Sequence, residues 1–171
     1  RLLDRFPSIE ALREIRNALK SEDEDLRISG SIAVEGLAEQ DPLPLARPLL
    51  ESWEDRWPLV QLVDSLGRAA GPEAVPDLIR LYERSQDMLV RVAAVRSIVN
   101  LGGAEAGPFC YSLLDSGSHP VKAIVLGGLA RLGYKPEDLR AQLLTLSESM
   151  HSRLALNAAI ALASVEPAES T

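Results

Sequence analysis

An internal repeat limits the fold of this chain more than any other feature. Residues 90–102 read VRVAAVRSIVNLG, and residues 121–133 read VKAIVLGGLARLG. Both segments begin with valine and a basic residue, continue through small and branched apolar residues, and end in Leu-Gly. The two segments start 31 residues apart. Repeats of about this length are typical of arrays in which each unit is one supersecondary structure that buries its apolar face only against its neighbours.

The repeat extends beyond these two segments. A basic residue followed 11 positions later by a small residue occurs at Arg27, Arg56, Arg91, Lys122 and, with a slip of about one residue, Arg153, at separations of 29, 35, 31 and 31 residues. We therefore expect one domain over residues 1–171 with five units, at about 7–40, 42–70, 72–103, 105–134 and 136–165.

Apolar residues follow each basic residue at helical spacing. They stand 3, 7 and 10 positions later, within an arc of about 60° on a helix, and are Gly30, Val34, Leu37; Leu59, Val63, Leu66; Ala94, Ile98, Leu101; and Val125, Leu129, Leu132. A further helix is expected before each, over residues 8–20, 43–54, 74–85, 106–115 and 136–148. Gly67, Gly102 and Gly133 stand where helices are expected to stop. No segment alternates with period two for long, so the fold class is all-α, with five antiparallel helix pairs.

The repeat units resemble HEAT-like repeats, of the short kind found in phycobilisome-lyase-type proteins. The resemblance rests on residues 23–39 (DEDLRISGSIAVEGLAE), on VRVAAVRSIVNLG with AVPDLIRLYERSQD before it, and on HPVKAIVLGGLARLG. It covers about residues 8–165, with departures at Trp57-Pro58 and Gly127-Gly128. The resemblance implies an α-solenoid with a right-handed superhelix whose second helices line the concave side.

Composition narrows the environment and the partners. The formal net charge of −7 disfavours binding to a phosphate backbone. Cys110 is the single cysteine, so an intrachain disulfide is impossible, and a reducing, cytoplasmic location is the simpler expectation. No apolar run approaches the ~18 residues of a membrane span. Because the chain starts at Arg1 rather than Met, we expect it to be part of a larger protein.

The sequence contains little that predicts chemistry. We call the repeated basic residues Arg27, Arg56, Arg91, Lys122 and Arg153 the basic row. Most of them follow acidic residues, so we expect each to bind a carboxylate or a helix-end carbonyl, as a ladder of contacts between repeats, rather than to form a polyanion site. His119 and His151 stand 32 residues apart, outside any metal-binding motif, and Cys110 lies in an apolar FCYSLL segment typical of a core. We expect no catalytic, metal or cofactor site. Gly127 and Gly128 stand inside an expected helix, and we expect them to allow close approach of a neighbouring helix rather than contact with a ligand or partner.

The side of the second helices opposite the buried face is the candidate partner surface. Positions 1, 5, 8 and 12 after each basic residue define it, and the selected residues are Trp57, Gln61, Asp64, Arg68, Val92, Arg96, Val99 and Tyr134, with Trp53 nearby. The strip mixes apolar and charged residues, which indicates either a binding groove or a register error of one position. The two tryptophans could equally fill a corner between helices of the second unit.

The sequence thus predicts a non-catalytic interaction or scaffold module, which holds a protein or peptide on its concave face. An enzyme or chromophore-handling protein of the phycobilisome-lyase type is the first alternative. A structural connector or sensor domain of a larger protein is the second.

Overall fold

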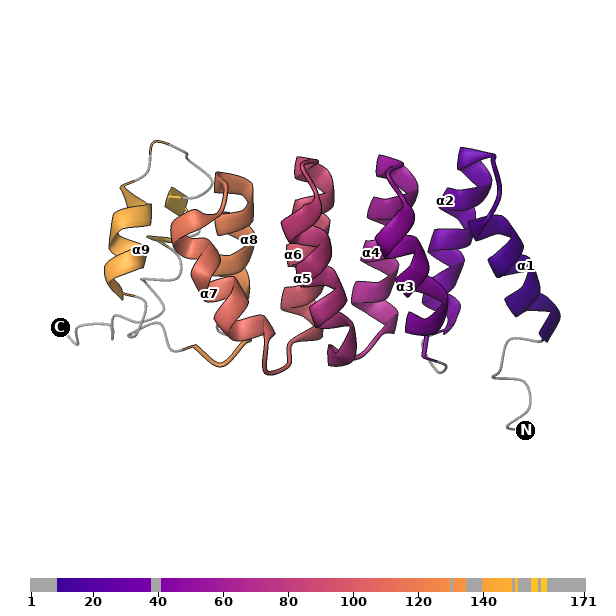
Figure 1. Ribbon diagram of the computed structural model, residues 1–171. Helices are drawn as coiled ribbons and strands as arrows, with labels where there is room; N and C mark the ends of the chain where they lie inside the picture. The colour runs from indigo at the N-terminus through magenta and orange to yellow at the C-terminus, as the bar shows by residue number, and fades with distance from the viewer. Residues whose placement is uncertain are drawn as a thin grey trace. The chain divides into compact units, whose positions relative to one another are not determined.

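The computed structural model describes residues 9–37, 41–129, 131–134, 140–148, 150, 155–156 and 158–159. Every regular element in these ranges is helical, so the all-α class is confirmed (Figure 1). The chain divides into two compact units, residues 1–101 and 102–171. This division falls between the third and fourth expected repeats, and the single-domain expectation stays a prediction.

The first compact unit consists of three helix pairs. They are α1 (Ile9–Leu19) with α2 (Glu24–Ala33), α3 (Leu43–Ser52) with α4 (Arg56–Ala69), and α5 (Val75–Arg84) with α6 (Met88–Leu101). Short 3₁₀ helices at Val34–Leu37 and Pro72–Ala74 follow α2 and precede α5. The helices of each pair contact one another, and α4 also contacts both α2 and α6 (Figure 1). The second helices α2, α4 and α6 therefore form a continuous row.

The second compact unit contains α7 (Ala106–Ser116), α8 (His119–Gly128) and α9 (Arg140–Ser147). Helices α7 and α8 pack together as the expected fourth pair. Helix α9 falls within the first helix expected for the fifth unit. The other predicted features of that unit, at residues 136–139 and Arg153, lie outside the described residues.

The residues that cap the second helices show the true register of the repeat. Asp23 is the N-cap of α2, Asp55 of α4 and Ser118 of α8, and Asp87 directly precedes α6. Asp23 Oδ1 accepts from the N–H of Asp25 at 2.9 Å, as carboxylates at helix N-termini commonly do. The four capping positions are separated by 32, 32 and 31 residues, which is more regular than the spacing of the basic residues.

This register corrects the alignment of the second unit. Arg27, Arg91 and Lys122 each stand four residues after the capping position, whereas Arg56 follows Asp55 directly. The alignment on basic residues therefore shifted the second unit by three positions.

One consequence of the shift concerns Gly67. The prediction that the helix stops there is wrong, because α4 continues to Ala69 and Gly67 is buried within it. Gly102 and Gly133 do adopt the positive φ values, 70° and 87°, of turns that follow helices.

The expected core face of the second helices is largely confirmed. Positions 7 and 11 after the cap are almost fully buried in α4, α6 and the α8 segment, where they are occupied by Leu62, Leu66, Ala94, Ile98, Val125 and Leu129. Each large side chain in this row stabilises the fold by about 1.5–3 kcal/mol through loss of contact with water. At the ends of the face, Leu101 and Leu132 are partly exposed, and the Leu37 side chain lies outside the described residues.

Gly127 differs from the expectation of close helix packing. It is exposed, and a Cβ added there would meet no heavy atom within 4 Å. Its neighbour Gly128 is buried. Close approach of a neighbouring helix is therefore no explanation for the first glycine of the pair.

Candidate partner-binding surface

With the register corrected, one exposed stripe runs along each second helix of the first compact unit. Positions 2, 6, 9 and 13 after the capping residue fall within about 60° of one another on a helix. We call these positions the outer stripe; they are Asp25, Ser29 and Ile32 on α2 with Gly36 on the 3₁₀ helix that follows it, Trp57, Gln61, Asp64 and Arg68 on α4, and Leu89, Ala93, Arg96 and Asn100 on α6. Of these twelve residues only Ala93 is buried. The outer stripe lies opposite the core face, and it contains all four candidates predicted in the second unit together with Arg96.

Large apolar side chains stand on this exposed stripe. Trp57 is 50% exposed, Ile32 48% and Leu89 43%. Single exposed apolar residues are ordinary on protein surfaces. Here one stands on each of three neighbouring helices, because α2 contacts α4 and α4 contacts α6. Their arrangement provides the apolar part of a surface that a protein segment could cover.

Charged residues of the stripe pair across neighbouring helices. Arg96 Nη2 donates to both carboxylate oxygens of Asp64, at 2.8 and 2.9 Å, and thereby joins α6 to α4. Arg68 Nε lies 2.8 Å from Glu35 Oε2 and joins α4 to the turn after α2. Exposed ion pairs contribute only about 0–1 kcal/mol each. Their main effect is to hold long side chains in place beside the apolar residues.

The predicted ladder of basic residues is present wherever the structure describes it. Arg27 donates to the carbonyls of Ser21 and Glu22 and, at 2.8 Å, to Asp55 Oδ2 in the next repeat. Arg56 Nε donates to Asp87 Oδ2, again one repeat further along. These two ion pairs bring the N-terminal ends of α2, α4 and α6 side by side.

Arg91 and Lys122, the other two residues of the row that the structure describes, bind carbonyls within their own repeats. Arg91 Nε donates to the carbonyl of Tyr82 at 3.2 Å, and its guanidinium lies 5.0 Å from the centre of that ring. Lys122 Nζ donates to the carbonyl of Asp115 at 3.0 Å. The ladder is therefore structural, and its cations are already engaged.

The capping carboxylate of Asp87 is also electrostatically stabilised. Burial favours its neutral form, but hydrogen bonds from Arg56 and from the N–H groups of Leu89 and Val90 outweigh that effect. The pKa of Asp87 consequently lies below its ordinary value. This carboxylate both caps α6 and holds α4 against it.

Two predicted partner residues on α6 lie outside the outer stripe. Val92, five positions after Asp87, is partly exposed at its margin. Val99 is only 4% exposed, so its predicted outward orientation is wrong. It holds the register position of Gly67, the position at which α4 contacts α6. Because α6 packs against both α4 and α5, apolar side chains surround most of this helix.

Trp53 and Tyr134 are not part of the second helices. Trp53 is the half-buried C-cap of α3, and its N–H donates to the carbonyl of Leu49. Tyr134 follows a turn beyond the end of α8 and stacks on Tyr111 of α7, with ring centres 5.4 Å apart. Tyr134 does not face outward with α8, because the helix ends at Gly128.

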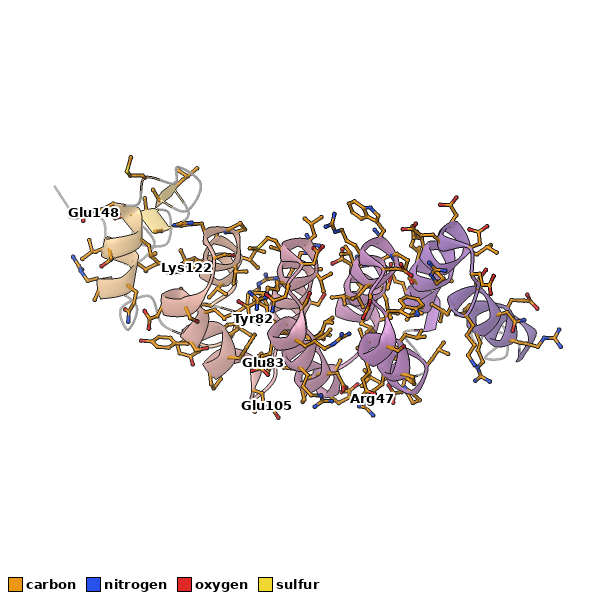
Figure 2. All side chains as sticks on the ribbon, turned by 45° about the horizontal axis from the view of Figure 1, so that its top comes forward. Arg47, Tyr82, Glu83, Glu105, Lys122 and Glu148 are labelled. Carbon is orange, nitrogen blue, oxygen red and sulfur yellow. The ribbon has the colours of Figure 1, made fainter. Side chains whose placement is uncertain are left out.

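An ion-pair cluster on the first helices was not found from the sequence. Arg47 stands on α3 (Figure 2) and donates to Asp77 Oδ2 of α5 from Nε and Nη2, at 3.0 and 2.9 Å. Arg80 binds the other oxygen of Asp77. The hydrogen bond and charge of Asp77 raise the pKa of Arg47. The separation of 30 residues between Arg47 and Asp77, close to the repeat length, is the signal that could have revealed it.

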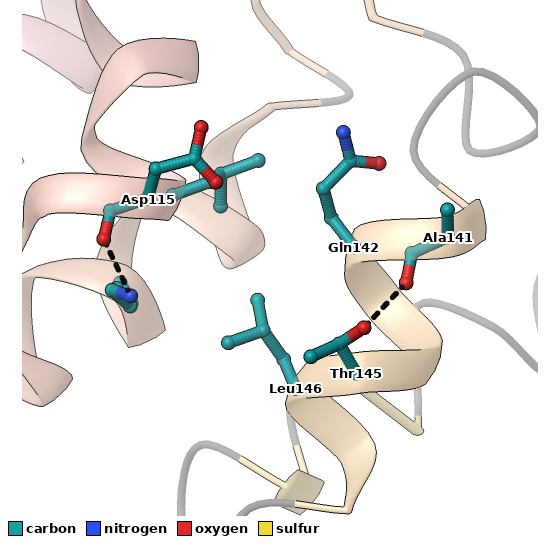
Figure 3. Close-up of a pocket in the computed structure, with 7 residues that line it drawn as sticks. Asp115, Ala141, Gln142, Thr145 and Leu146 are labelled. Atoms are coloured by element: carbon teal, nitrogen blue, oxygen red, sulfur yellow. Dashed lines mark hydrogen bonds between the residues drawn. The ribbon is translucent and has the colours of Figure 1, made fainter.

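A pocket of about 380 Å³ lies in the second compact unit (Figure 3). Its lining consists of Leu114, Asp115, Lys122, Ala141, Gln142, Thr145 and Leu146. Lys122 already donates to a backbone carbonyl, and Gln142 Nε2 donates to the Tyr111 hydroxyl at 2.9 Å. Thr145 Oγ1 bonds to the carbonyl of Ala141 within α9. The lining thus contains polar groups that support the local structure, and nothing in it pairs a nucleophile with a base.

Residues that could support chemistry are separated from one another in the described part of the chain. Cys110 is buried in α7, and this burial raises the pKa of its thiol to about 11. Among the described residues, no three His, Cys, Asp or Glu side chains gather as a metal site would require. His151 lies outside those residues.

Two further observations concern membranes and relatives. Within the described ranges, no helix has both the length and the apolar character needed to cross a bilayer. Comparison of the sequence with models of known protein families and with curated proteins found no match. Functional inference therefore rests on the surface described above.

Proposed function

We propose that this chain is a non-catalytic, cytoplasmic protein-binding module, built as an α-solenoid of HEAT-like repeats with antiparallel helix pairs. A peptide or neighbouring domain binds across the outer stripe of α2, α4 and α6. The regular spacing of the capping residues supports the repeat assignment. So do side-chain contacts between residues about one repeat apart, as at Arg27–Asp55 and Arg47–Asp77. Repeat arrays of this kind use extended faces to bind proteins.

The observation that carries the proposal is that Trp57 is exposed on a surface where ion pairs join neighbouring repeats. Tryptophan side chains contribute disproportionately to binding when a partner buries them. Trp57 follows Asp55 and Arg56, both of which are fixed by ion pairs to neighbouring repeats. Its backbone is therefore held in place before a partner arrives, which lowers the entropy lost on binding.

The test is affinity capture from cells that produce the protein, with the whole 171-residue chain as bait. The stripe variant carries Ile32→Ser and Trp57→Ala, and the control carries Leu144→Ser, an equally exposed apolar residue on α9. The proposal predicts a partner that the wild type and the control retain and that the stripe variant loses. Retention of every captured protein by the stripe variant would contradict it. An absorbance spectrum of the purified protein separately tests the chromophore-handling alternative, because a bound bilin absorbs visible light.

A further inference from the structure

We infer that the partner segment is a basic amphipathic helix, which lies across the N-terminal ends of α2, α4 and α6. This inference rests on the proposed function and adds the chemistry of the partner. It combines a row of exposed apolar side chains with an excess of unpaired carboxylates beside that row.

The apolar row occupies the first turns of three adjacent helices. Leu26 on α2, Trp57 on α4, and Met88 and Leu89 on α6 are each between 42% and 51% exposed. Trp57 and Leu89 hold the same register position. Leu26 stands one residue later and Met88 one residue earlier, so their side chains project about 100° to either side of that face. The ion pairs from Arg27 to Asp55 and from Arg56 to Asp87 keep these first turns together.

The spacing of the row suits a helical partner. Packed helices lie about 8–10 Å apart, so apolar contacts recur along the row at about that interval. Seven residues of an α-helix rise about 10.5 Å and return to nearly the same face. A partner helix with apolar residues at seven-residue intervals would therefore place one of them at each second helix.

The charge beside the row selects a basic partner. Besides the capping Asp23, four exposed carboxylates in the turns before and at the start of α2 and α4 form no ion pair with another described residue: Glu22, Glu24, Asp25 and Glu54. Among the described residues around these first turns, the exposed cations are Lys20, Arg56 and Arg84. Arg56 is already paired with Asp87, and Arg84 donates to the carbonyl of Leu50. The unpaired charge is thus predominantly negative. A second copy of the same edge would bring like charges together, so a basic segment is favoured over self-association.

The first experiment uses synthetic 21-residue helical peptides and the full chain with Trp53→Phe, so that Trp57 is the only tryptophan. The probe has leucine at every seventh position and lysine on the flanking positions. One control peptide replaces lysine by glutamate, and another replaces leucine by serine. The inference predicts a blue shift of Trp57 emission with the basic leucine peptide and at least tenfold weaker binding of both controls. Equal binding of the basic leucine and basic serine peptides would overturn it.

The second experiment locates the site through variants of the protein and a fluorescently labelled peptide. Leu26→Ser with Leu89→Ser, and Glu24→Gln with Glu54→Gln, should each weaken binding about tenfold or more. Leu144→Ser and Glu83→Gln, exposed residues of α9 and α5, serve as matched controls and should leave binding unchanged. Equal effects of edge and control variants would overturn the inference.

The proposed function and this inference can fail separately. Suppose that Ile32→Ser with Trp57→Ala abolishes binding of a cellular partner, whereas Glu24→Gln with Glu54→Gln leaves that binding unchanged. This result would refute the basic helix and leave the protein-binding function standing. Loss of that partner with both pairs of substitutions supports both.

Discussion

Gly67 of α4 and Ser97 of α6 pack so closely that no side chain fits between them. A Cβ at position 67 would lie 2.7 Å from Ser97 Cβ and 3.0 Å from Ser97 Cα. The buried Ser97 hydroxyl donates to the carbonyl of Val63 at 2.9 Å across the same contact. The second helices α4 and α6 therefore approach closely because Gly67 has no side chain, and the Ser97 hydrogen bond joins them at the same contact.

Gly67→Ala should lower the free energy of unfolding by about 1–3 kcal/mol, because the added methyl group meets the backbone of Ser97 and the helices must separate. Gly127→Ala is the matched control: it adds the same atom in α8 where nothing lies within 4 Å. The control should raise the free energy of unfolding by about 0.5–1 kcal/mol, since alanine favours helix over glycine. Urea unfolding measures both, and equal changes would refute the close contact.

Arg27→Met should lower the free energy of unfolding by about 1–3 kcal/mol, because three acceptors lose a charged hydrogen-bond donor. Methionine retains much of the apolar stem, so the loss reports mainly on the hydrogen bonds to Ser21, Glu22 and Asp55. Arg13→Met, at a highly exposed position, should change stability by less than about 0.5 kcal/mol. Thermal or urea unfolding of the two variants makes the comparison. Similar small effects would show that the ladder does not stabilise the repeats.

The lowered pKa of Asp87 predicts a pH dependence that Asp87→Asn removes. Because the folded-state pKa lies below the unfolded value of about 3.9, the ionised carboxylate favours the folded state. Its contribution is complete above about pH 5 and disappears as the pH falls through the folded pKa. Asparagine caps a helix about as well as aspartate, so the variant loses mainly the charge.

Urea unfolding of the wild type and Asp87→Asn at pH values from 2 to 7 measures this contribution. The difference in the free energy of unfolding should be constant above about pH 5 and should shrink below about pH 4. Arg56→Gln should reduce the pH-dependent part, because Arg56 donates to the same carboxylate. A difference that does not vary with pH would contradict the assignment.

Cys110 should react very slowly with thiol reagents at pH 8 in the folded protein. Burial raises the pKa of its thiol to about 11, so little thiolate is present, and the sulfur is also inaccessible. Absorbance with Ellman's reagent should show a slow reaction that becomes rapid in denaturant. Labelling of the native protein at the rate of a free thiol would place Cys110 outside the core.

The sequence predicted the helices well because apolar periodicity and helix capping are local signals. It located the first helices α1, α3, α5 and α7 nearly to the residue, and it identified the core face that includes Leu66, Ala94 and Ile98. The basic ladder was predicted too, because acidic residues precede its members in the sequence.

The errors came from choosing the wrong repeated residue as the reference. Arg56 reaches Asp87 from the first turn of α4, whereas Arg27 reaches Asp55 from one turn further into α2. Similar chemistry therefore comes from different register positions, whereas the capping residues keep a nearly constant spacing. Gly67 was misplaced by this shift, and Val99 was misplaced because its burial depends on contacts with other helices, which local spacing does not encode.

The most direct test of the account measures two properties of Trp57→Ala: its affinity for the captured partner and its free energy of unfolding. Trp57 is half exposed, so its truncation should change the free energy of unfolding by less than about 0.5 kcal/mol. The account predicts that partner affinity nevertheless falls at least tenfold, a loss of about 1.4 kcal/mol. Unchanged affinity, or a loss of stability as large as the loss of binding, would contradict the account.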